Sequence, residues 1–529
     1  MKKLFSKLIT FTLCVAIGIS CIGCGQVGTV KDAGSSVVQM YVWDSGFGTA
    51  WVKEIVDEYN AMKTGYTVDL KTHANMRTVT DTLSAGNSNV YDLYITGLAS
   101  WTGTIPDMAD LSEVANATYG NEGRTIGSKM NSRAIARHTH DGKLTAFGVG
   151  TSGAGLFYNS EIFADANITE EPKTTNELDT VVWDIQSANL KTSDGTVIRP
   201  FVHWSDSNNG YWKYIYEVWA AQAFGIAGYE DFIKLKNENG INQKNVYLGL
   251  NADGSDNKEN DARYQILSYL EGILTTETVH SRSSEFNLAG AQSAFVNGET
   301  AMMINGSWLK NEASMGSSVN NFKLMRTPVF SGAVKHLEYR DNGAYMSDDL
   351  FSDIIGAIDD DKTYEEVKES ICAELTQADY DMIKTLRGIS YGTLGEAGQV
   401  VFAPKYSSSL PAVKDFLKYF YSDAGAQAWI DHQHTPFAVE LVNEDLVDKS
   451  GWDEWDKSIA EILEDQTYSL GGDLNSSKIL VRNARDMFAN VSIILTLTAP
   501  LAKDRMNANQ VYAQMRTSIN SNWDNWNKA

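Results

Sequence analysis

The chain has 529 residues, of which 43% are hydrophobic and 21% are charged. This composition is typical of a folded protein with more than one packed core, and it argues against disorder as the main state. The formal net charge is −23, and a surface this acidic repels phosphate backbones and anionic lipids. We therefore expect no nucleic-acid partner and no membrane binding through a basic patch.

The N-terminus, MKKLFSKLITFTLCVAIGISCIGCG, has three lysines before an apolar run that is too short to span a bilayer comfortably. This pattern predicts a signal peptide over residues 1–23, and its removal makes the net charge −26 because it contains three lysines and no acidic residue. The pair Gly23-Cys24 resembles the lipobox of bacterial lipoproteins, which implies that Cys24 is lipidated. Residues 24–36 are small and polar and predict a flexible tether.

The cysteines provide no disulfide framework. Cys21 and Cys24 have the C-x-x-C spacing of redox and zinc sites, but their place at the end of a signal peptide favours a processing site. Cys14 lies within the signal peptide, so the mature chain keeps Cys24 and Cys372. We therefore expect core burial, and not disulfides, to stabilise the folded body.

The folded body opens with a strand, a turn and a helix. Residues 37–43 are β-rich, and after a glycine-rich turn Trp51, Ile55 and Tyr59 recur at helical spacing. Two further strands are predicted in YTVDLK and VYDLYITG, which makes a βαβ-type opening with a parallel sheet. Trp51 belongs to the apolar stripe of the helix, so we expect it in the core.

Later elements follow the same α/β pattern. Capping-box spacing predicts helices that begin at Thr174 and at Thr363, with Glu177 and Glu366 three residues on. TAMMI is short and apolar, as a buried strand is, and KDFLKYFYSDAGAQAWI predicts two helices that are separated near Ser422. No internal repeat is found.

Two glycine motifs resemble enzyme motifs, but each lacks a feature that the enzyme motif requires. Gly148-x-Gly150-x-x-Gly153 follows a strand, but the next residues continue as a strand, so the helix N-terminus that would hold a pyrophosphate is missing. GTSGA resembles a nucleophile elbow around Ser152, but alanine replaces the last glycine. A flexible polar passage is the simpler interpretation of both.

The histidine pairs His138/His140 and His432/His434 could each supply two metal ligands, but no neighbouring cysteine or carboxylate cluster completes a site. We therefore expect no metal and no cofactor. A glycosidase-like pair among the 67 acidic residues stays open, because only the distance between two carboxylates in space decides it.

Aromatic residues at the ends of predicted elements are the more informative signal, because loops above a rigid sheet are where ligands bind. For each of them alone, core packing is the alternative. Sugar rings present flat faces of C–H groups that suit such side chains, and their hydroxyls need polar partners. The candidate binding residues are the aromatics Trp43, Trp101, Tyr211, Trp212 and Trp308 and the polar residues Asp44, Asp92, Thr96, Ser152 and Asn305.

The segment NGETAMMINGSWL resembles the signature of the carbohydrate-type extracellular solute-binding proteins of ABC importers, the group that includes maltose-binding protein. Other segments match in the family's order: YVWDSGFG, DGKLTAFGVGTSGAGLFYN, EEPKTTNEL, LMRTPVFSG and AVKDFLKYFYSDAGAQAWIDHQHTPFA. The resemblance implies the α/β type II periplasmic-binding-protein fold, in which two lobes are joined by three hinge crossings and the ligand lies between them. We expect lobe 1 over residues 37–148 and 329–420, lobe 2 over 149–328 and 421–529, and the second crossing at 327–332.

By the same resemblance the chain is a monomeric receptor, anchored by lipid at the outer face of the cytoplasmic membrane or in a periplasm. It would capture a neutral sugar or oligosaccharide and pass it to permease subunits without performing chemistry. Trp308 would form part of a sugar-stacking floor, and Gly306 would let the chain turn into the next helix. The alternatives are a binding protein for a peptide, polyamine or metal, and a surface glycan-degrading enzyme. Segments 225–279, 340–400 and 441–529 are expanded beyond the typical member.

Overall fold

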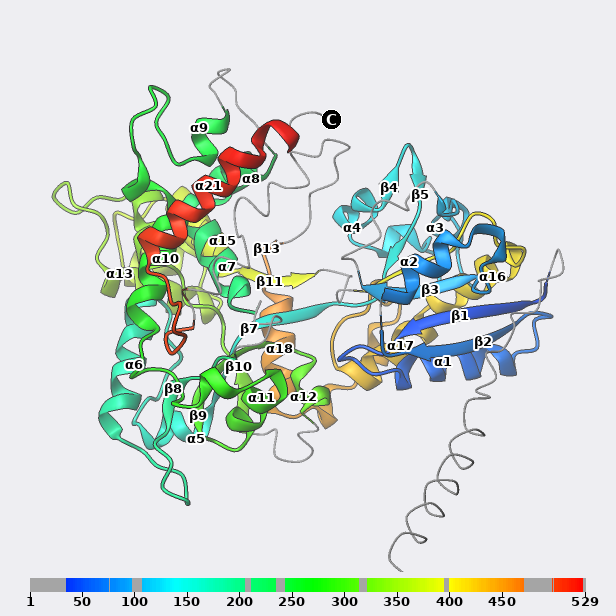
Figure 1. The fold of residues 1–529 in the computed structure, drawn as a ribbon, viewed down its shortest axis with the longest axis horizontal. Coiled ribbons are helices and arrows are strands. Elements are labelled where there is room, and N and C mark those ends of the chain that lie inside the picture. Colours follow the sequence, from blue (N-terminus) through cyan, green and yellow to red (C-terminus); the bar gives the residue numbers. More distant parts are fainter. Residues whose placement is uncertain are drawn as a thin grey trace, which may run out of the picture.

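The structure is a computed structural model that describes residues 35–75, 77–97, 107–204, 211–234, 243–313, 321–393, 399–470, 497 and 499–526. Figure 1 shows two α/β bodies side by side. We call them lobe 1, with the described residues of 35–149 and 399–453, and lobe 2, with those of 150–393 and 454–526. The predicted signal peptide, the tether and Trp101 lie outside the described residues.

Lobe 1 is built on a five-stranded sheet in the order β2-β1-β3-β12-β6. β1 pairs in parallel with β2 and β3, which confirms the predicted opening, and β12 returns from far along the chain to pair antiparallel with β3. The strands are β1 (Val37–Trp43), β2 (Thr67–His73), β3 (Leu93–Gly97), β6 (Phe147–Gly148) and β12 (Gln399–Phe402), and a separate hairpin pairs β4 (Thr139–His140) with β5 (Lys143–Leu144).

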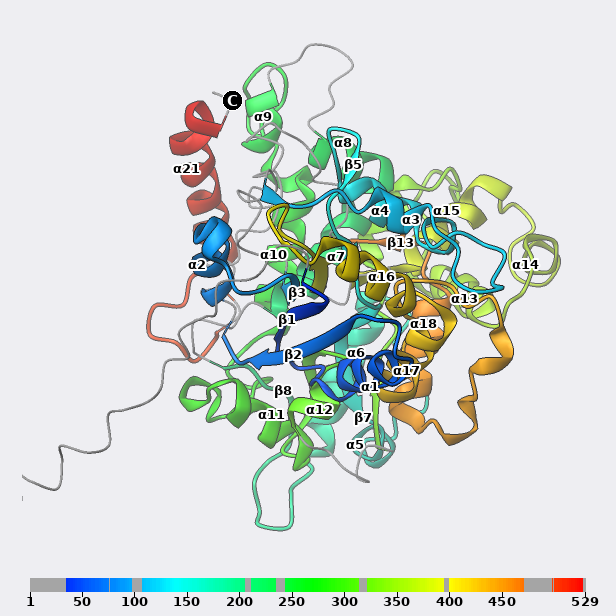
Figure 2. The ribbon, with the colours of Figure 1, turned by 90° about the vertical axis from the view of Figure 1, so that its right-hand side faces the viewer.

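Three helices pack together against this sheet. Figure 2 views the molecule from the lobe 1 end. Trp51 on the first of them is 1% exposed and meets Trp429 edge to face, with 4.9 Å between ring centroids, which confirms its place in the core. The helices are α1 (Ala50–Ala61), α16 (Leu410–Phe420) and α17 (Asp423–Gln433), with the shorter α2 (Arg77–Ser84), α3 (Ser112–Ala115) and α4 (Ser132–Arg137) elsewhere in the lobe.

Lobe 2 is built on a six-stranded sheet, and β7 is its central strand. β7 pairs antiparallel with β9, β10 and β11, so no helix follows the glycine motif at 148–153 and the strand continues as predicted. The strands are β7 (Ser152–Asn159), β8 (Arg199–Phe201), β9 (Thr300–Gly306), β10 (Phe322–Leu324), β11 (Ile389–Thr393) and β13 (Tyr468–Ser469).

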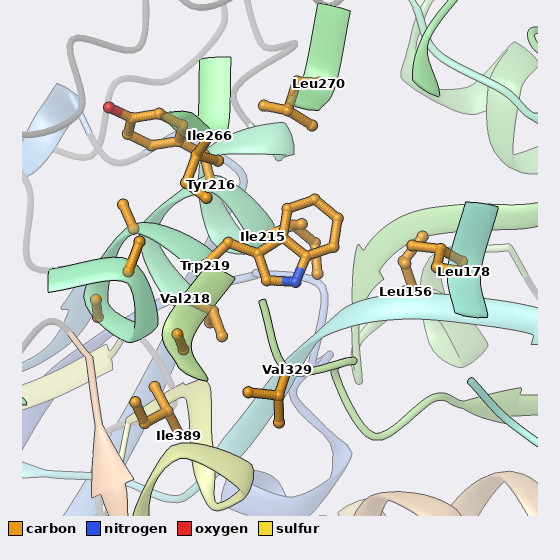
Figure 3. Close-up of a cluster of buried hydrophobic side chains, with 14 of the residues drawn as sticks. Leu156, Leu178, Ile215, Tyr216, Val218, Trp219, Ile266, Leu270, Val329 and Ile389 are labelled. Carbon is orange, nitrogen blue, oxygen red and sulfur yellow. The ribbon is translucent and has the colours of Figure 1, made fainter. Parts of the chain in front are cut away.

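Helices enclose this sheet and form the larger core of the molecule. Figure 3 shows part of that core, where Trp219 lies among Ile215, Leu270 and Val329. The helices are α5 (Ser160–Asp165), α6 (Thr175–Ala188), α7 (Trp212–Phe224), α8 (Ile226–Lys234), α9 (Gln243–Tyr247), α10 (Ala262–Ile273), α11 (Leu288–Val296), α12 (Leu309–Glu312), α13 (Asp348–Asp359), α14 (Tyr364–Ser370), α15 (Gln377–Arg387), α18 (Glu454–Glu464) and α21 (Ala508–Trp526).

The predicted helix starts are found in the structure. At Thr363 both halves of the capping box with Glu366 are formed. At Thr174 the hydroxyl accepts from the Glu177 backbone N–H at 3.2 Å, but the Glu177 carboxylate accepts from the Lys173 backbone N–H and not from that of Thr174. Both arrangements satisfy backbone donors that a helix N-terminus leaves open.

The lobe boundaries differ from the expected ones in two segments. Residues 329–393 pack in the core of lobe 2, with Ile354 and Ile383 fully buried there, and residues 421–452 pack on lobe 1. The second crossing expected at 327–332 was also wrong, because the backbone N–H of Val329 donates to the Lys173 carbonyl at 2.8 Å inside lobe 2. An extended Pro-Gly segment has the same sequence pattern whether it joins two lobes or crosses one.

His203 provides a pH-dependent prediction. It is 1% exposed, and burial lowers the pKa of its imidazole from 6.5 to about 4. Between these values the unfolded chain binds a proton that the folded chain does not, so stability falls as the pH drops from 6.5 towards 4. We expect His203 to account for a loss of about 3 kcal/mol in the free energy of unfolding over that window.

The measurement is urea unfolding at pH 7 and pH 4.5, comparing the wild type with His203→Leu. The variant should lose less stability on acidification than the wild type. An equal loss in both proteins would mean that His203 does not carry the effect.

Candidate ligand-binding site between the lobes

Trp308 lies where the two lobes meet. It lies two residues after the end of β9, directly precedes α12 and is half-buried. Its ring meets Tyr211 of lobe 2 edge to face at 5.9 Å between centroids and Phe47 of lobe 1 in the same manner at 5.9 Å. Trp308 therefore packs against side chains of both lobes.

The glycine two positions before Trp308 makes room for the indole. A Cβ atom on Gly306 would lie 2.2 Å from Cη2 of Trp308, which no real contact allows. Gly306 is not among the residues with a positive φ, so the turn itself does not require glycine. The need for glycine before α12 is therefore steric, because the missing side chain lets the Trp308 ring fold back over the strand end.

Trp308 begins a group of aromatic side chains in lobe 2, which we call the aromatic cluster: Trp204, Tyr211, Tyr214, Trp308 and Tyr391. The indole N–H of Trp308 donates to the Tyr211 hydroxyl at 3.2 Å. The ring of Tyr211 stacks on that of Tyr214 with 5.2 Å between centroids, and the ring centroids of Tyr214 and Tyr391 lie 4.4 Å apart. Trp204 and Tyr214 are buried, whereas the other three are partly exposed, so the cluster has a supported inner layer and accessible ring surface.

Three members of the cluster, Trp204, Tyr214 and Tyr391, were missed from the sequence. Tyr214 follows Tyr211 by three residues, so helical spacing alone could have identified it. Tyr391 comes from β11 inside an expanded segment, where no motif marks it, and only the pairing of β11 with β7 brings it to the cluster.

A loop of lobe 1 contacts α12 beside Trp308. The side-chain amide of Asn311 donates to the Gly46 carbonyl at 2.8 Å, and Gln399 Nε2 donates to Ser45 Oγ at 2.8 Å within lobe 1. A Cβ atom on Gly46 would lie 2.7 Å from Glu312 Oε1 and 2.9 Å from Trp308 Cβ. This loop therefore approaches lobe 2 as closely as a glycine permits.

Gly46→Ala should weaken ligand binding about fivefold to tenfold by disfavouring this approach of the lobes, a cost of about 1 kcal/mol. Glu312 can swing its carboxylate aside, but the Cβ of Trp308 moves only with its backbone. Calorimetric titration measures the change. Gly451→Ala is the control, since a Cβ there would meet nothing within 4 Å. Equal affinities in both variants would contradict a role for this contact in binding.

Trp43 and Asp44 lie at the same end of lobe 1 as this loop. Trp43 ends β1 and is partly exposed, and Asp44 is exposed, with its backbone N–H donating to the His73 carbonyl at 2.8 Å. Ligands in α/β proteins bind at the carboxyl ends of parallel strands, and that is where both residues lie. They stay candidates for ligand contact.

Asp92 and Thr96 are buried within lobe 1, at 0% and 1% exposure. Asp92 precedes β3, so it lies at the opposite end of the sheet from Asp44. Its carboxylate accepts from the Gln39 backbone N–H at 2.9 Å and from Ser407 Oγ at 2.6 Å. These contacts fit a residue that holds strands together, and we leave both out of the proposed site.

Trp212, Asn305 and Ser152 are buried within lobe 2. Trp212 is 2% exposed and packs edge to face on Phe201, and Asn305 is 0% exposed with its Oδ1 accepting from the Gly306 backbone N–H at 2.8 Å. Ser152 is 6% exposed at the start of β7. The sequence places these residues next to exposed neighbours, but the strand and helix periods turn their side chains inward.

The segment around Gly150, where the chain passes from lobe 1 into lobe 2, pairs with residues 436–438 of lobe 1. The backbone N–H of Thr151 donates to the Pro436 carbonyl at 2.8 Å, and that of Ala438 donates to the Val149 carbonyl at 3.0 Å. Gly150 lies between these bonds, and a Cβ there would come 2.3 Å from the Trp429 ring. The hinge at Gly150 is therefore held to an extended segment of lobe 1, with a tryptophan packed against it.

A buried carboxylate, that of Asp456, lies at the start of α18 and makes hydrogen bonds to both lobes. Asp456 is 4% exposed and accepts from His434 Nδ1 at 2.6 Å and from Lys310 Nζ at 2.8 Å. Burial alone would raise the pKa of Asp456, but these two hydrogen bonds outweigh burial and lower it. Because His434 belongs to lobe 1 and Lys310 to lobe 2, Asp456 links the lobes electrostatically.

The side chains of the pair His432/His434 have different partners in the structure. His432 Nε2 lies 2.9 Å from the Glu54 carboxylate, whereas His434 contacts Asp456. Within the described ranges, no group of three His, Cys, Asp or Glu side chains converges as a metal site requires. In that same part of the chain no helix has the length and apolarity needed to cross a bilayer.

Solved structures of two-lobed binding proteins align with nearly the whole chain. One is a chitin oligosaccharide binding protein, with a TM-score of 0.59 and 14% identity over 94% of this chain and 100% of that chain. Another is a cyclic alpha-maltosyl-1,6-maltose binding protein from Arthrobacter globiformis, with a TM-score of 0.57 and 15% identity over 92% of this chain and 99% of that chain. The GacH receptor of Streptomyces glaucescens, solved with and without acarbose, aligns with a TM-score of 0.57 and 15% identity over 93% of this chain and 99% of that chain. At these identities the likeness establishes the fold, which is the type II two-lobed periplasmic-binding-protein fold.

Sequence comparison identifies the family. No curated protein matches the chain significantly over its sequence. A family model described as bacterial extracellular solute-binding protein does match it, over residues 54–324, which is more than half of its length. The chain is a member of the bacterial extracellular solute-binding protein family.

Proposed function

We propose that this protein captures a neutral sugar or oligosaccharide between its lobes and delivers it to the permease subunits of an ABC importer. The observation that carries the proposal is the aromatic cluster, in which Tyr211, Trp308 and Tyr391 are partly exposed and Trp308 lies at the junction of the lobes. The solved structures with the same fold include proteins whose names specify oligosaccharide ligands, and this supports the same ligand class here.

Binding would use both lobes at once. A sugar ring stacked on the aromatic cluster leaves its edge hydroxyls towards the opposite lobe, where Asp44 and Ser45 lie beside the Gly46 loop. Closing the lobes removes water and completes hydrogen bonds that neither lobe makes alone. Affinity then depends on the lobe arrangement as well as on direct contacts.

The test is calorimetric titration with neutral oligosaccharides of graded length. We expect micromolar or tighter binding of at least one series, with affinity rising until the chain fills the site. Tight binding of a peptide, polyamine or metal ion, without any sugar binding, would contradict the proposal.

The protein should bind its sugar without altering it. The family consists of binding proteins, and we include the absence of catalysis in the proposal. Long incubation with oligosaccharides followed by product analysis tests this point. Release of shorter products, lost on substitution of an acidic residue near the aromatic cluster, would favour a glycan-degrading enzyme.

Lipid anchoring at Cys24 is part of the proposal and is supported by the sequence Gly23-Cys24 after the apolar run. Cys24→Ala should release the protein from membranes or block removal of the signal peptide, because the thiol is the site of lipid attachment. Detergent-phase partitioning and the mass of the mature chain measure this. Cys21→Ala is the matched control and should stay anchored, and unchanged partitioning of Cys24→Ala would contradict the proposal.

A further inference from the structure

Trp183 on α6 is 67% exposed, the largest exposed fraction among the large hydrophobic side chains that the structure describes as exposed. Figure 1 places α6 on the side of lobe 2 that faces away from lobe 1. A tryptophan left in water forgoes the free energy of burying a large ring. Its exposure leaves a large ring face available to a ligand from outside the chain.

A groove of about 520 Å³ lies beside Trp183, between α6 and α10. This volume is within the range of small-molecule sites, about 300–1,000 Å³. Its lining includes Asp179, Trp183, Gln186, Ser268, Gly272 and Thr275. None of these lining residues is basic, so the groove does not suit an anionic ligand.

Gly272 is the informative position in this groove. It lies in the last turn of α10, and glycine is a weaker helix former than alanine. Its φ is not positive, and a Cβ there would meet no atom within 4 Å. Neither backbone conformation nor packing against the described chain explains the missing side chain. An occupant from outside the chain that needs this space does explain it.

The chemistry of the groove suits one kind of occupant. Trp183 offers a flat apolar ring, and the Asp179 carboxylate with the Ser268 and Thr275 hydroxyls can hydrogen-bond to the edge of a ring stacked on it. The Gln186 side-chain N–H donates to the Glu277 carbonyl at 3.2 Å, which holds this amide at the groove wall. An aromatic face beside acid, amide and hydroxyl groups matches a pyranose ring.

We propose that the groove between α6 and α10 is a second carbohydrate-binding site, which holds a neutral polysaccharide strand with one sugar ring stacked on Trp183. It shares its ligand class with the proposed function but none of the residues of the aromatic cluster. Because the groove is open along the surface, it accepts internal segments of a long chain, whereas capture between two closing lobes favours short oligosaccharides. Such a site keeps the receptor near polymers from which its transported sugars are released.

The test is affinity electrophoresis of the mature full-length protein in gels that contain soluble starch, xylan or glycol chitin. We expect at least one polymer to retard the wild type, and Trp183→Ala to raise the apparent dissociation constant at least tenfold. Gly272→Leu should do the same by filling the groove, and because leucine is a better helix former it should not unfold α10. Tyr345→Ala is the matched control, since Tyr345 is 55% exposed and lies outside the groove.

Two comparisons separate this site from the one between the lobes. In the polymer gels Trp308→Ala should migrate as slowly as the wild type. In solution Trp183→Ala should bind short oligosaccharides with unchanged affinity. The proposal is overturned if no polymer retards the wild type, or if retardation depends on Trp308 and not on Trp183. It is also overturned if Trp183→Ala retains polymer binding but impairs sugar import by cells, because the surface would then contact a protein.

Discussion

Replacing Trp308 with alanine should weaken oligosaccharide binding by about 2–3 kcal/mol, which is roughly a 30- to 150-fold rise in the dissociation constant. The indole provides ring surface at the junction of the lobes and positions the Tyr211 hydroxyl, which it contacts at 3.2 Å. Since Trp308 is half-buried, stability should fall less than the roughly 3–5 kcal/mol expected for a fully buried tryptophan. Calorimetry and urea unfolding on the same preparation measure both quantities.

Trp308→Phe is the matched control, because it keeps an aromatic face and loses the N–H that contacts Tyr211. It should bind with an affinity between those of the wild type and the alanine variant. A large loss of stability in Trp308→Ala with unchanged affinity per folded molecule would show that Trp308 is a packing residue and not part of the ligand site.

Gly150→Ala should destabilise the protein by about 3 kcal/mol, because the new methyl group would overlap the indole of Trp429. The Cβ would lie 2.3 Å from Cζ2 and 2.4 Å from Cε2 of that ring. The ring cannot move aside easily, since it is 0% exposed, meets Trp51 at 4.9 Å and donates its N–H to Thr435 Oγ1 at 3.2 Å. The free energy of unfolding in urea measures the loss.

Gly153→Ala offers a matched control three residues further along the same segment. Its Cβ would approach Leu324 Cδ2 at 3.2 Å, and the end of a leucine side chain can shift by a few tenths of an ångström. We expect a change of about 1 kcal/mol or less for this variant. Equal losses at the two positions would contradict the account of Gly150 as the point where the hinge packs on Trp429.

Much of the fold could be predicted because local patterns and packing agree. The period of Trp51, Ile55 and Tyr59 predicts the face of α1 that is buried, and Thr363 with Glu366 predicts the start of α14. The division of the chain between the lobes could not be predicted in the same way. Residues 329–393 and 421–452 are helices and strands with ordinary apolar faces, and nothing in their local sequence says which sheet those faces cover.

The candidate site was predicted in part for a similar reason. Tyr211 and Trp308 were identified from their places at element ends, and the structure brings them into contact. Asp92 and Asn305 have residue types that suit sugar hydroxyls, but each is used inside its own lobe. Residue type predicts the chemistry that a side chain can perform, whereas strand direction and register decide whether it meets a ligand or the core.

The most direct test of capture between the lobes is small-angle X-ray scattering of the protein with and without the oligosaccharide that binds most tightly in the titrations. If the ligand is held by both lobes, saturation should lower the radius of gyration in the wild type. Gly46→Ala, which disfavours the approach of the lobes, should show a smaller decrease at the same saturation. A scattering curve that saturating ligand leaves unchanged would contradict the closure of two lobes around a sugar.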